Sequence, residues 1–358
     1  MWTIDVRPGK ENFVPQALLR KSNLAELITL LLGRQKVVGP VSLGNDQFRF
    51  AEINSSAELS LDYLPTILPP KKYFLPPHEM LLHYDIAAGQ QMQALAEVEE
   101  LVLFGVHTCD LAGIQCLNMI FSDRPRDLHY LLRKNHLTLI GLECNDCCDH
   151  HANCALLHTH LPKGGYDLFL SDLGADYFVD IATHKGEQLV AAAQLFEPVT
   201  AAAQDALATL RRNKKERFKS TLPMRYEDLP YLLEETVDSA IWQQVGEKCL
   251  SCGNCTNVCP TCYCFDMVDE PQLDLSKGQR VRTWDSCQHE PFAKVAGGES
   301  FRAERAARQR HRFNRKFNYP MARYRRLFCT GCGRCSRACM AAIDVQETLK
   351  ALIEERGR

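Results

Sequence analysis

The sequence has little net charge, no long apolar stretch and no recognisable nucleotide-binding loop, and each absence argues against a class of protein. With 42 Lys and Arg residues against 44 Asp and Glu residues, the formal charge is only −2, which argues against a nucleic-acid binder. No apolar run approaches the roughly 18 residues that a membrane span needs. Residues 1–10 lack the basic-then-apolar order of a signal peptide, so we expect a cytoplasmic protein.

The usual signatures of enzyme chemistry are also missing. No G-x-G-x-x-G follows an expected strand and no G-x4-G-K-[ST] occurs, so the sequence offers no evident dinucleotide or triphosphate site. No Ser/His/Asp or paired-carboxylate arrangement stands out either. The 358 residues, 46% of them hydrophobic, are nevertheless typical of a globular protein with two domains.

Cysteine is the residue present in excess. Of 17 cysteines, six lie between positions 109 and 154 and eleven between positions 249 and 339. An odd number of cysteines in a long chain that is not expected to be secreted indicates metal ligation rather than a disulfide framework.

Eight cysteines form two runs with the spacing C-x2-C-x2-C-x3-C. They are Cys249, Cys252, Cys255 and Cys259, followed by Cys329, Cys332, Cys335 and Cys339. Ferredoxins hold [4Fe–4S] clusters with this spacing, and in two-cluster ferredoxins the fourth cysteine ligates the other cluster. We therefore predict that Cys339 completes the first ligand set and Cys259 the second. Structural zinc is the alternative, although a four-ligand zinc site has no need of the third x2 step.

The remaining cysteines permit more than one interpretation. Cys262, Cys264 and Cys287 are expected to pack near the clusters as small apolar groups. A second set follows two expected strands and could hold a third [4Fe–4S] cluster; it consists of Cys109, Cys144, Cys148 and Cys154, with Cys147 nearby. Zinc is an alternative there, because four histidines lie between positions 150 and 160, and the absence of any metal is another.

The predicted fold class is α+β. An N-terminal α/β domain over residues 1–225 is expected to precede a mostly helical, ferredoxin-type domain over residues 226–358. Continuous or alternating apolar character predicts strands at 101–106, 137–142, 166–170 and 177–181. Helices are predicted at about 23–32, within 180–210 and at 232–242. A basic tract over 302–326 is either a solvated helix face or a set of cations that raises cluster potentials and lines a docking surface.

The motifs together resemble those of the iron–sulfur β subunit of cytoplasmic nickel–iron sulfhydrogenases, and the related iron–sulfur subunit of anaerobic sulfite reductases is similar in the same places. The resemblance rests on residues 249–266, Trp284-Asp-Ser-Cys287, Ala296-Gly-Gly, Phe301-Arg302, Arg310-His-Arg-Phe and Lys316-Phe-Asn-Tyr319. It extends to the first half through Tyr73-Phe-Leu-Pro-Pro-His-Glu79, Gly105-Val-His-Thr-Cys-Asp110 and Gly141-Leu-Glu-Cys144.

This resemblance implies a non-catalytic electron-transfer subunit of an oxidoreductase hetero-oligomer. Its partners would be a flavin- and NAD(P)-binding subunit and the small and large nickel–iron hydrogenase subunits. In the family, Gly-x-Arg-x-Cys-Asp, a cysteine at the next strand end and Cys-Phe-Cys occur in the N-terminal domain. Cys109 and Cys144 match the first two, whereas His107 replaces the arginine and Cys147-Cys148 with Cys154 stand in place of Cys-Phe-Cys.

Three rival functions remain open on the sequence alone. The same subunit could feed a sulfite reductase, which shares these motifs. The chain could instead be a zinc-stabilised interaction module, or an enzyme with a substrate cleft at Cys109 and Cys144.

Overall fold

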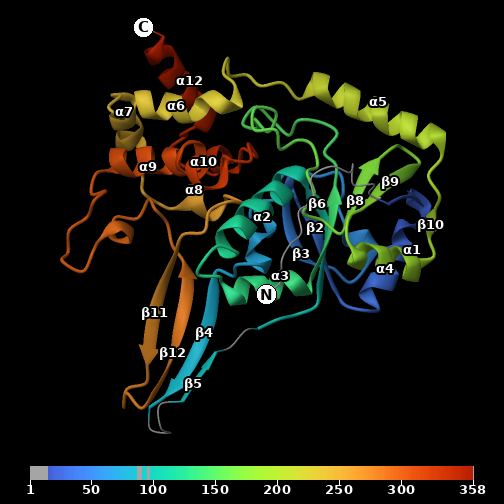
Figure 1. Cartoon of the computed structure of the whole chain (residues 1–358), viewed down its shortest axis with the longest axis horizontal. Helices are drawn as coiled ribbons and strands as arrows, with labels where there is room; N and C mark the ends of the chain where they lie inside the picture. The colour runs from blue at the N-terminus through green and yellow to red at the C-terminus, as the bar shows by residue number, and fades with distance from the viewer. Residues whose placement is uncertain (1–14, 87–90, 95–96, 358) are drawn as a thin grey trace.

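The structure is a computed structural model that describes residues 15–86, 91–94 and 97–357. Residues 1–10, whose order argues against a signal peptide, lie outside the described residues. In Figure 1 an α/β part and a helical part lie side by side, and a small sheet projects from between them. The predicted α+β class is confirmed.

An eight-stranded sheet organises the N-terminal part, in the order β10-β1-β9-β8-β7-β6-β2-β3. Neighbouring strands from β2 to β8 in this order run parallel, and β9, β1, β10 and β3 pair antiparallel. The strands are β1 (Gln16–Arg20), β2 (Lys36–Gly44), β3 (Gln47–Glu52), β6 (Leu101–His107), β7 (Leu137–Leu142), β8 (Leu168–Asp172), β9 (Asp176–Ile181) and β10 (Phe196–Glu197). Every residue of β6 and β7 is buried, as expected for central parallel strands of continuous apolar sequence.

Five helices accompany this sheet: α1 (Leu24–Leu32), α2 (Thr108–Phe121), α3 (Leu128–His136), α4 (His184–Ala193) and α5 (Ala201–Arg217). The four predicted strands and the first predicted helix are confirmed. The helical prediction for 180–210 is wrong in its continuity, because Gln194 adopts a left-handed conformation with φ of 55° after α4 and the short strand β10 follows.

The helical part contains α6 (Leu229–Glu235), α7 (Ile241–Lys248), α8 (Asn254–Asn257), α9 (Arg305–Phe317), α10 (Tyr319–Tyr324), α11 (Arg334–Arg337) and α12 (Val345–Arg356). Its core includes Trp242, Phe313 and Leu352. The helix predicted at 232–242 is divided in two. Thr236 Oγ1 donates to Leu232 O at the end of α6, and Ser239 Oγ accepts from Ile241 N at the start of α7. Across the described ranges, no helix is long and apolar enough to cross a membrane.

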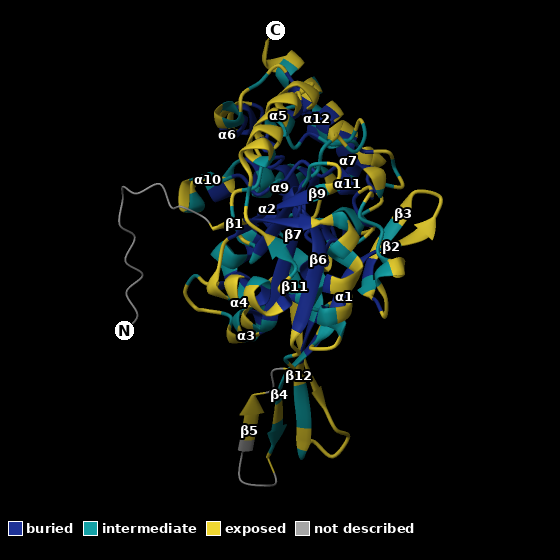
Figure 2. Cartoon of the chain, turned by 90° about the vertical axis from the view of Figure 1, so that its right-hand side faces the viewer, coloured by how far each residue is buried: buried dark blue, intermediate teal, exposed yellow. Residues whose placement is uncertain are grey.

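A second sheet joins distant segments in the order β11-β12-β4-β5. Its strands are β4 (His78–Asp85), β5 (Gln91–Ala94), β11 (Phe265–Pro271) and β12 (Lys277–Trp284). β12 pairs antiparallel with β4 from Thr283 opposite His78 to Lys277 opposite Asp85. Figure 2 shows this sheet projecting from the body with mostly exposed or half-buried residues. The boundary predicted at 225/226 falls between α5 and α6 and stays a prediction.

Candidate cluster-binding sites

The two cysteine runs fold as the same loop. The backbone has positive φ at equivalent positions: Ser251 (55°) and Gly253 (76°) in the first, Gly331 (65°) and Gly333 (73°) in the second. Each loop then enters a single helical turn, α8 or α11, and these two turns pack against each other. The sequence repeat is therefore a structural repeat, and it brings the two loops together.

Backbone amides of these loops point at the sulfurs. Ser251 N lies 3.3 Å from Cys249 Sγ, Gly331 N lies 3.4 Å from Cys329 Sγ, and Ile343 N lies 3.3 Å from Cys339 Sγ. Hydrogen bonds to sulfur stabilise thiolates and help to set the potential of a bound cluster. The donor set and its amide environment thus fit [4Fe–4S] ligation.

Two cavities lie where the loops meet. Cys249, Cys252 and Cys255 of the first run line one of them together with Cys339 of the second run. The other is lined by Cys255, Cys259, Cys329 and Cys335. This grouping places Cys339 and Cys259 beside the opposite run, while Cys332 does not line either cavity; the predicted ligand sets remain predictions. In the described part of the chain, no three His, Cys, Asp or Glu side chains form a group that could hold a single metal ion.

The basic tract contributes directly to these sites. From α9, Arg305 Nη1 donates to Cys249 O at 2.8 Å, Arg308 Nη2 to Ser251 Oγ at 3.1 Å, and Gln309 Nε2 to Cys249 Sγ at 2.9 Å. Arg308 is buried. Part of the tract is therefore turned onto the first loop rather than forming a purely solvated face.

Two cations of α9 border these cavities. Arg312 lines both of them, and Lys316 lines the one that contains Cys259. Burial disfavours the charge of each, but Cys255 and Cys335 raise the pKa of Arg312, and Cys259 and Cys262 raise that of Lys316. Because cluster ligands must be thiolates, these cations offset buried negative charge.

Two N-terminal cysteines lie at the carboxyl ends of adjacent central strands of the large sheet. Cys109 lies in the first turn of α2 directly after β6, and Cys144 follows the adjacent parallel strand β7. Thr108 Oγ1 lies 3.8 Å from Cys144 Sγ. A cavity of about 650 Å³ at these strand ends is lined by Cys144, Cys147 and Cys148, but not by Cys109 or Cys154. The predicted third ligand set is thus only partly gathered around one cavity.

Burial dominates the acid–base chemistry of these thiols. It raises the pKa of Cys148 to about 12 and, more strongly, that of Cys154; the neighbouring Cys144 sulfur acts in the same direction on both. Cys332, from the second run, similarly contributes to the raised pKa of Cys109, after burial and Asp110. The charges of Cys144, Cys148 and Cys154 therefore affect one another, and that of Cys332 in the second loop affects Cys109.

A buried ion pair joins the first turn of α2, beside Cys109, to the second cysteine loop. Arg334 Nη1 and Nη2 donate to the two carboxylate oxygens of Asp110 at 2.6 and 2.8 Å. The side chains of Arg334 and Asp110 are 1% and 0% exposed. Arg334 also donates to Thr66 O at 2.6 Å. No motif in the sequence indicates this pair, although Asp110 follows Cys109 and Arg334 lies between Cys332 and Cys335.

Close backbone contacts reinforce the same junction. A Cβ added to Gly113 of α2 would lie 2.6 Å from Pro260 Cβ, and one added to Gly331 would lie 2.4 Å from Asn153 O. Asn153 N also donates to Gly331 O at 2.8 Å. Pro260 is therefore in contact with α2, and the 150–160 segment covers the second loop.

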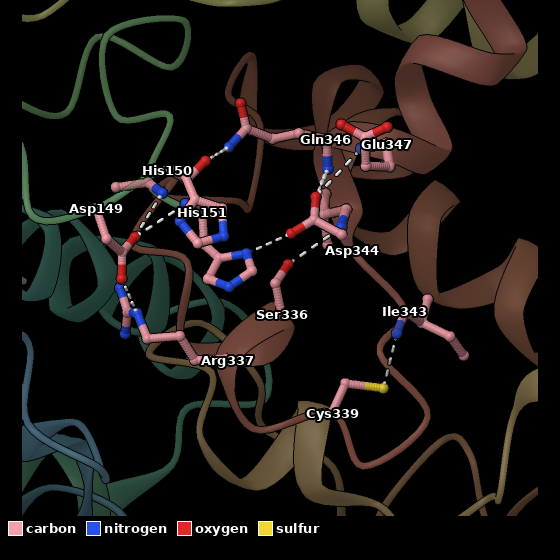
Figure 3. Close-up of polar contacts among 12 residues, drawn as sticks. Asp149, His150, His151, Ser336, Arg337, Cys339, Ile343, Asp344, Gln346 and Glu347 are labelled. Carbon is pink, nitrogen blue, oxygen red and sulfur yellow. Dashed lines mark hydrogen bonds and ion pairs between the residues drawn. The ribbon is translucent and has the colours of Figure 1, made fainter.

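The histidines of that segment make structural contacts in the described chain. His151 Nδ1 lies 2.6 Å from Asp344 Oδ2, and His150 O accepts from Gln346 Nε2 at 2.8 Å, as Figure 3 shows. Asp344 also accepts from the amides at the start of α12. Asp149 accepts from Arg337 of α11, so residues 149–151 are bound to the C-terminal end of the second run and to the start of α12.

The paired loops define a class of protein. Residues 248–343 match the family model described as a 4Fe-4S dicluster domain. The chain is therefore an iron–sulfur protein with [4Fe–4S] clusters.

The whole chain defines the family more closely. It is 37% identical over 327 residues to sulfhydrogenase 2 subunit beta of Pyrococcus furiosus, covering 90% of this chain and 92% of that protein. The chain belongs to this sulfhydrogenase β-subunit family and is an iron–sulfur electron-transfer subunit.

Shorter similarities connect it to another class of oxidoreductase. F420-dependent formate dehydrogenase 1 subunit beta of Methanococcus maripaludis is 26% identical over 118 residues, 31% of this chain and 30% of that protein. The corresponding subunit of Methanocaldococcus jannaschii is 25% identical over 130 residues, 36% of this chain and 34% of that protein. These similarities cover too little of either chain to define a shared function.

Proposed function

We propose that the chain relays single electrons between a flavin- and NAD(P)-binding subunit and a nickel–iron hydrogenase module in a soluble, cytoplasmic hetero-oligomer. Two [4Fe–4S] clusters would be held by Cys249, Cys252, Cys255 with Cys339, and by Cys329, Cys332, Cys335 with Cys259. A third cluster would be held in the N-terminal part, beside the carboxyl ends of β6 and β7, by Cys109, Cys144, Cys148 and Cys154.

The observation that carries this proposal is the adjacency of the two sulfur-lined cavities. Cys255 and Arg312 border both of them, so two bound clusters would be near neighbours. The Asp110–Arg334 pair brings the N-terminal cysteines close to the second loop, which would extend the series in that direction. A chain of closely spaced one-electron centres is suited to conduction between partners rather than to catalysis.

The hydrogenase partner is supported by the relative that matches almost the whole chain. Co-purification of a siroheme protein would instead indicate a sulfite reductase partner. A colourless protein with stoichiometric zinc would support the interaction module.

The test is Cys252→Ala in the complex purified from its native host. We expect the loss of about four irons per chain, since one ligand of one cluster is removed. Hydrogen-dependent reduction of NAD(P) should stop, whereas hydrogen-dependent reduction of a viologen dye at the hydrogenase module should continue. Cys116→Ser is the matched control, because Cys116 is a buried free thiol that lines neither cluster cavity. Full-rate NAD(P) reduction by Cys252→Ala would refute the relay.

A further inference from the structure

The two cysteine loops have equivalent backbones but different surroundings. The N-terminal half of the chain covers the second loop, where Asn153 N donates to Gly331 O at 2.8 Å. Asp110 of α2 pairs with the buried Arg334 of the same loop. Pro260, which ends the first run, is also buried and lies against α2. One side of the paired loops is therefore covered by other parts of this chain.

The equivalent positions on the other side are open to solvent. Cys252 is exposed, whereas Cys332, the second cysteine of the other run, is only 9% exposed. Leu250 is 62% exposed, whereas Thr330 at the equivalent position is 3% exposed. Met340 is 77% exposed, at the position that a buried proline occupies in the first run. Residues with equivalent places in the two loops thus differ in whether protein covers them.

The exposed side chains of the open side are apolar and lie together. Leu250 and Met340 come from different runs, yet both border the cavity that contains Cys249, Cys252 and Cys339. Grouped apolar side chains at exposed positions mark surfaces that a partner covers, and methionine is enriched in protein interfaces. The covered loop has the polar Thr330 where the open loop has Leu250. The open side therefore has the composition of an interface rather than that of a solvated surface.

A third apolar side chain and several cations adjoin this surface. Arg308 connects them to the first loop, because its Nη1 donates to Arg302 O at 3.0 Å and its Nη2 to Ser251 Oγ at 3.1 Å. Phe301, the residue before Arg302, is 76% exposed. Within the described ranges, no carboxylate pairs with the cations of this region, which are Lys248, Arg302, Arg305 and Arg308. They outnumber the two carboxylates adjacent to them in sequence, Glu247 and Glu304, so the region has an excess of positive charge.

We propose that Leu250, Cys252, Phe301 and Met340, with the four cations beside them, form an open face that docks a redox partner subunit. The partner is a protein that presents an apolar patch rimmed by Asp and Glu side chains, with a one-electron centre behind it. The inference rests on the proposed function, since the partner would exchange electrons with the cluster assigned to the first loop. Each transfer oxidises one centre and reduces the other by one electron, and no bond is made or broken.

A second copy of this chain is a poor occupant of the open face. In a two-fold dimer the same surface meets itself, so the cations of one copy would lie against those of the other. Like charges placed opposite each other disfavour association. An acidic partner gains from the same cations, which is why the open face selects it.

The first test is cross-linking of the complex purified anaerobically from its native host. A carbodiimide joins lysine amines directly to carboxylates, and Lys248, the exposed residue before Cys249, is the reporter. We expect mass spectrometry of the digest to find Lys248 joined to Asp or Glu of another subunit. Two results would overturn the inference. One is the absence of this link when other lysines of the chain are joined to partner subunits, and the other is a dimer of this chain cross-linked through Lys248.

The second test is Leu250→Glu in the same complex. We expect retention of the docked subunit in gel filtration to fall by about tenfold or more, as for an apolar residue at the centre of an interface. Iron content should equal that of the unaltered complex, which also shows that the variant has folded. Met340→Glu should give the same result from the other run. Leu128→Glu is the matched control, because Leu128 of α3 is 65% exposed, and it should release no subunit.

The docking face and the relay can fail separately. If Leu250→Glu releases a subunit but Cys252→Ala keeps full-rate NAD(P) reduction, the docking face is supported and the relay is refuted. If Leu250→Glu and Met340→Glu keep their iron and release nothing while Cys252→Ala stops NAD(P) reduction, the relay is supported and the docking face is overturned.

Discussion

Replacing Asp110 by Asn should loosen the second cysteine loop while leaving the first in place. Asp110 is the anionic partner of Arg334, and neither side chain reaches solvent. Asn can accept one of the two hydrogen bonds but carries no charge, so the guanidinium stays buried without a counter-ion. Removing one partner of a buried pair costs about 3–5 kcal/mol. Arg334 keeps its hydrogen bond to Thr66 O, so we expect about 3 kcal/mol, the lower end of that range.

The change should appear as local opening, measured by amide hydrogen exchange of residues 329–339 followed by mass spectrometry. About 3 kcal/mol corresponds to exchange faster by on the order of 100-fold. The matched control is Asp269→Asn, which removes the carboxylate of an exposed pair with Arg280, with contacts of 2.7 and 2.8 Å. That control should have little effect, because exposed pairs contribute little to stability. If the two variants gave the same exchange in the second loop, the reasoning from burial would be refuted.

Two further predictions concern α9. Lys316→Gln should lower the potential of the cluster next to Cys259 by on the order of 100 mV, because Lys316 lines the same cavity as Cys259 and the variant loses its positive charge. At an effective dielectric constant of about 20, two unit charges interact by about 4 kcal/mol at 4 Å and by less at longer range. Redox titration monitored by electron paramagnetic resonance measures the shift, and exposed Lys350→Gln, expected to leave it unchanged, is the control. Burial, aided by Arg302, lowers the pKa of His311 to about 4, so the unfolded chain binds a proton below about pH 6.5 that the folded chain does not. Stability should therefore fall as the pH is lowered from 6.5 towards 4, and less steeply in His311→Gln; equal slopes in guanidinium unfolding would contradict this.

Local patterns predicted much of this molecule. The apolar runs located β6 and β7 because buried parallel strands need no alternation. The cysteine spacing predicted two equivalent loops, and the left-handed residues at matching positions confirm their equivalence. These features depend on residues close together in the sequence, which is why the sequence alone sufficed.

Long-range contacts could not be predicted in the same way. The pairing of β12 with β4 depends on register between segments about 200 residues apart, which neither strand encodes by itself. The same is true of Arg334 and Asp110, which are 224 residues apart and which no sequence motif couples. The breaks after α4 and α6 were missed because single polar side chains and one left-handed residue, rather than periodicity, end those helices.

The small projecting sheet has a consequence for how this protein can be divided. β12 lies between β11, its neighbour in sequence, and β4, from the opposite half of the chain. A fragment limited to residues 226–358 would lose β4 and expose the free edge of β12, whose unpaired amides and carbonyls invite self-association. The ferredoxin-like half therefore cannot be separated from the rest of the chain at residue 226. A fragment meant to refold alone, or to be fused to another enzyme, would have to include residues 78–94.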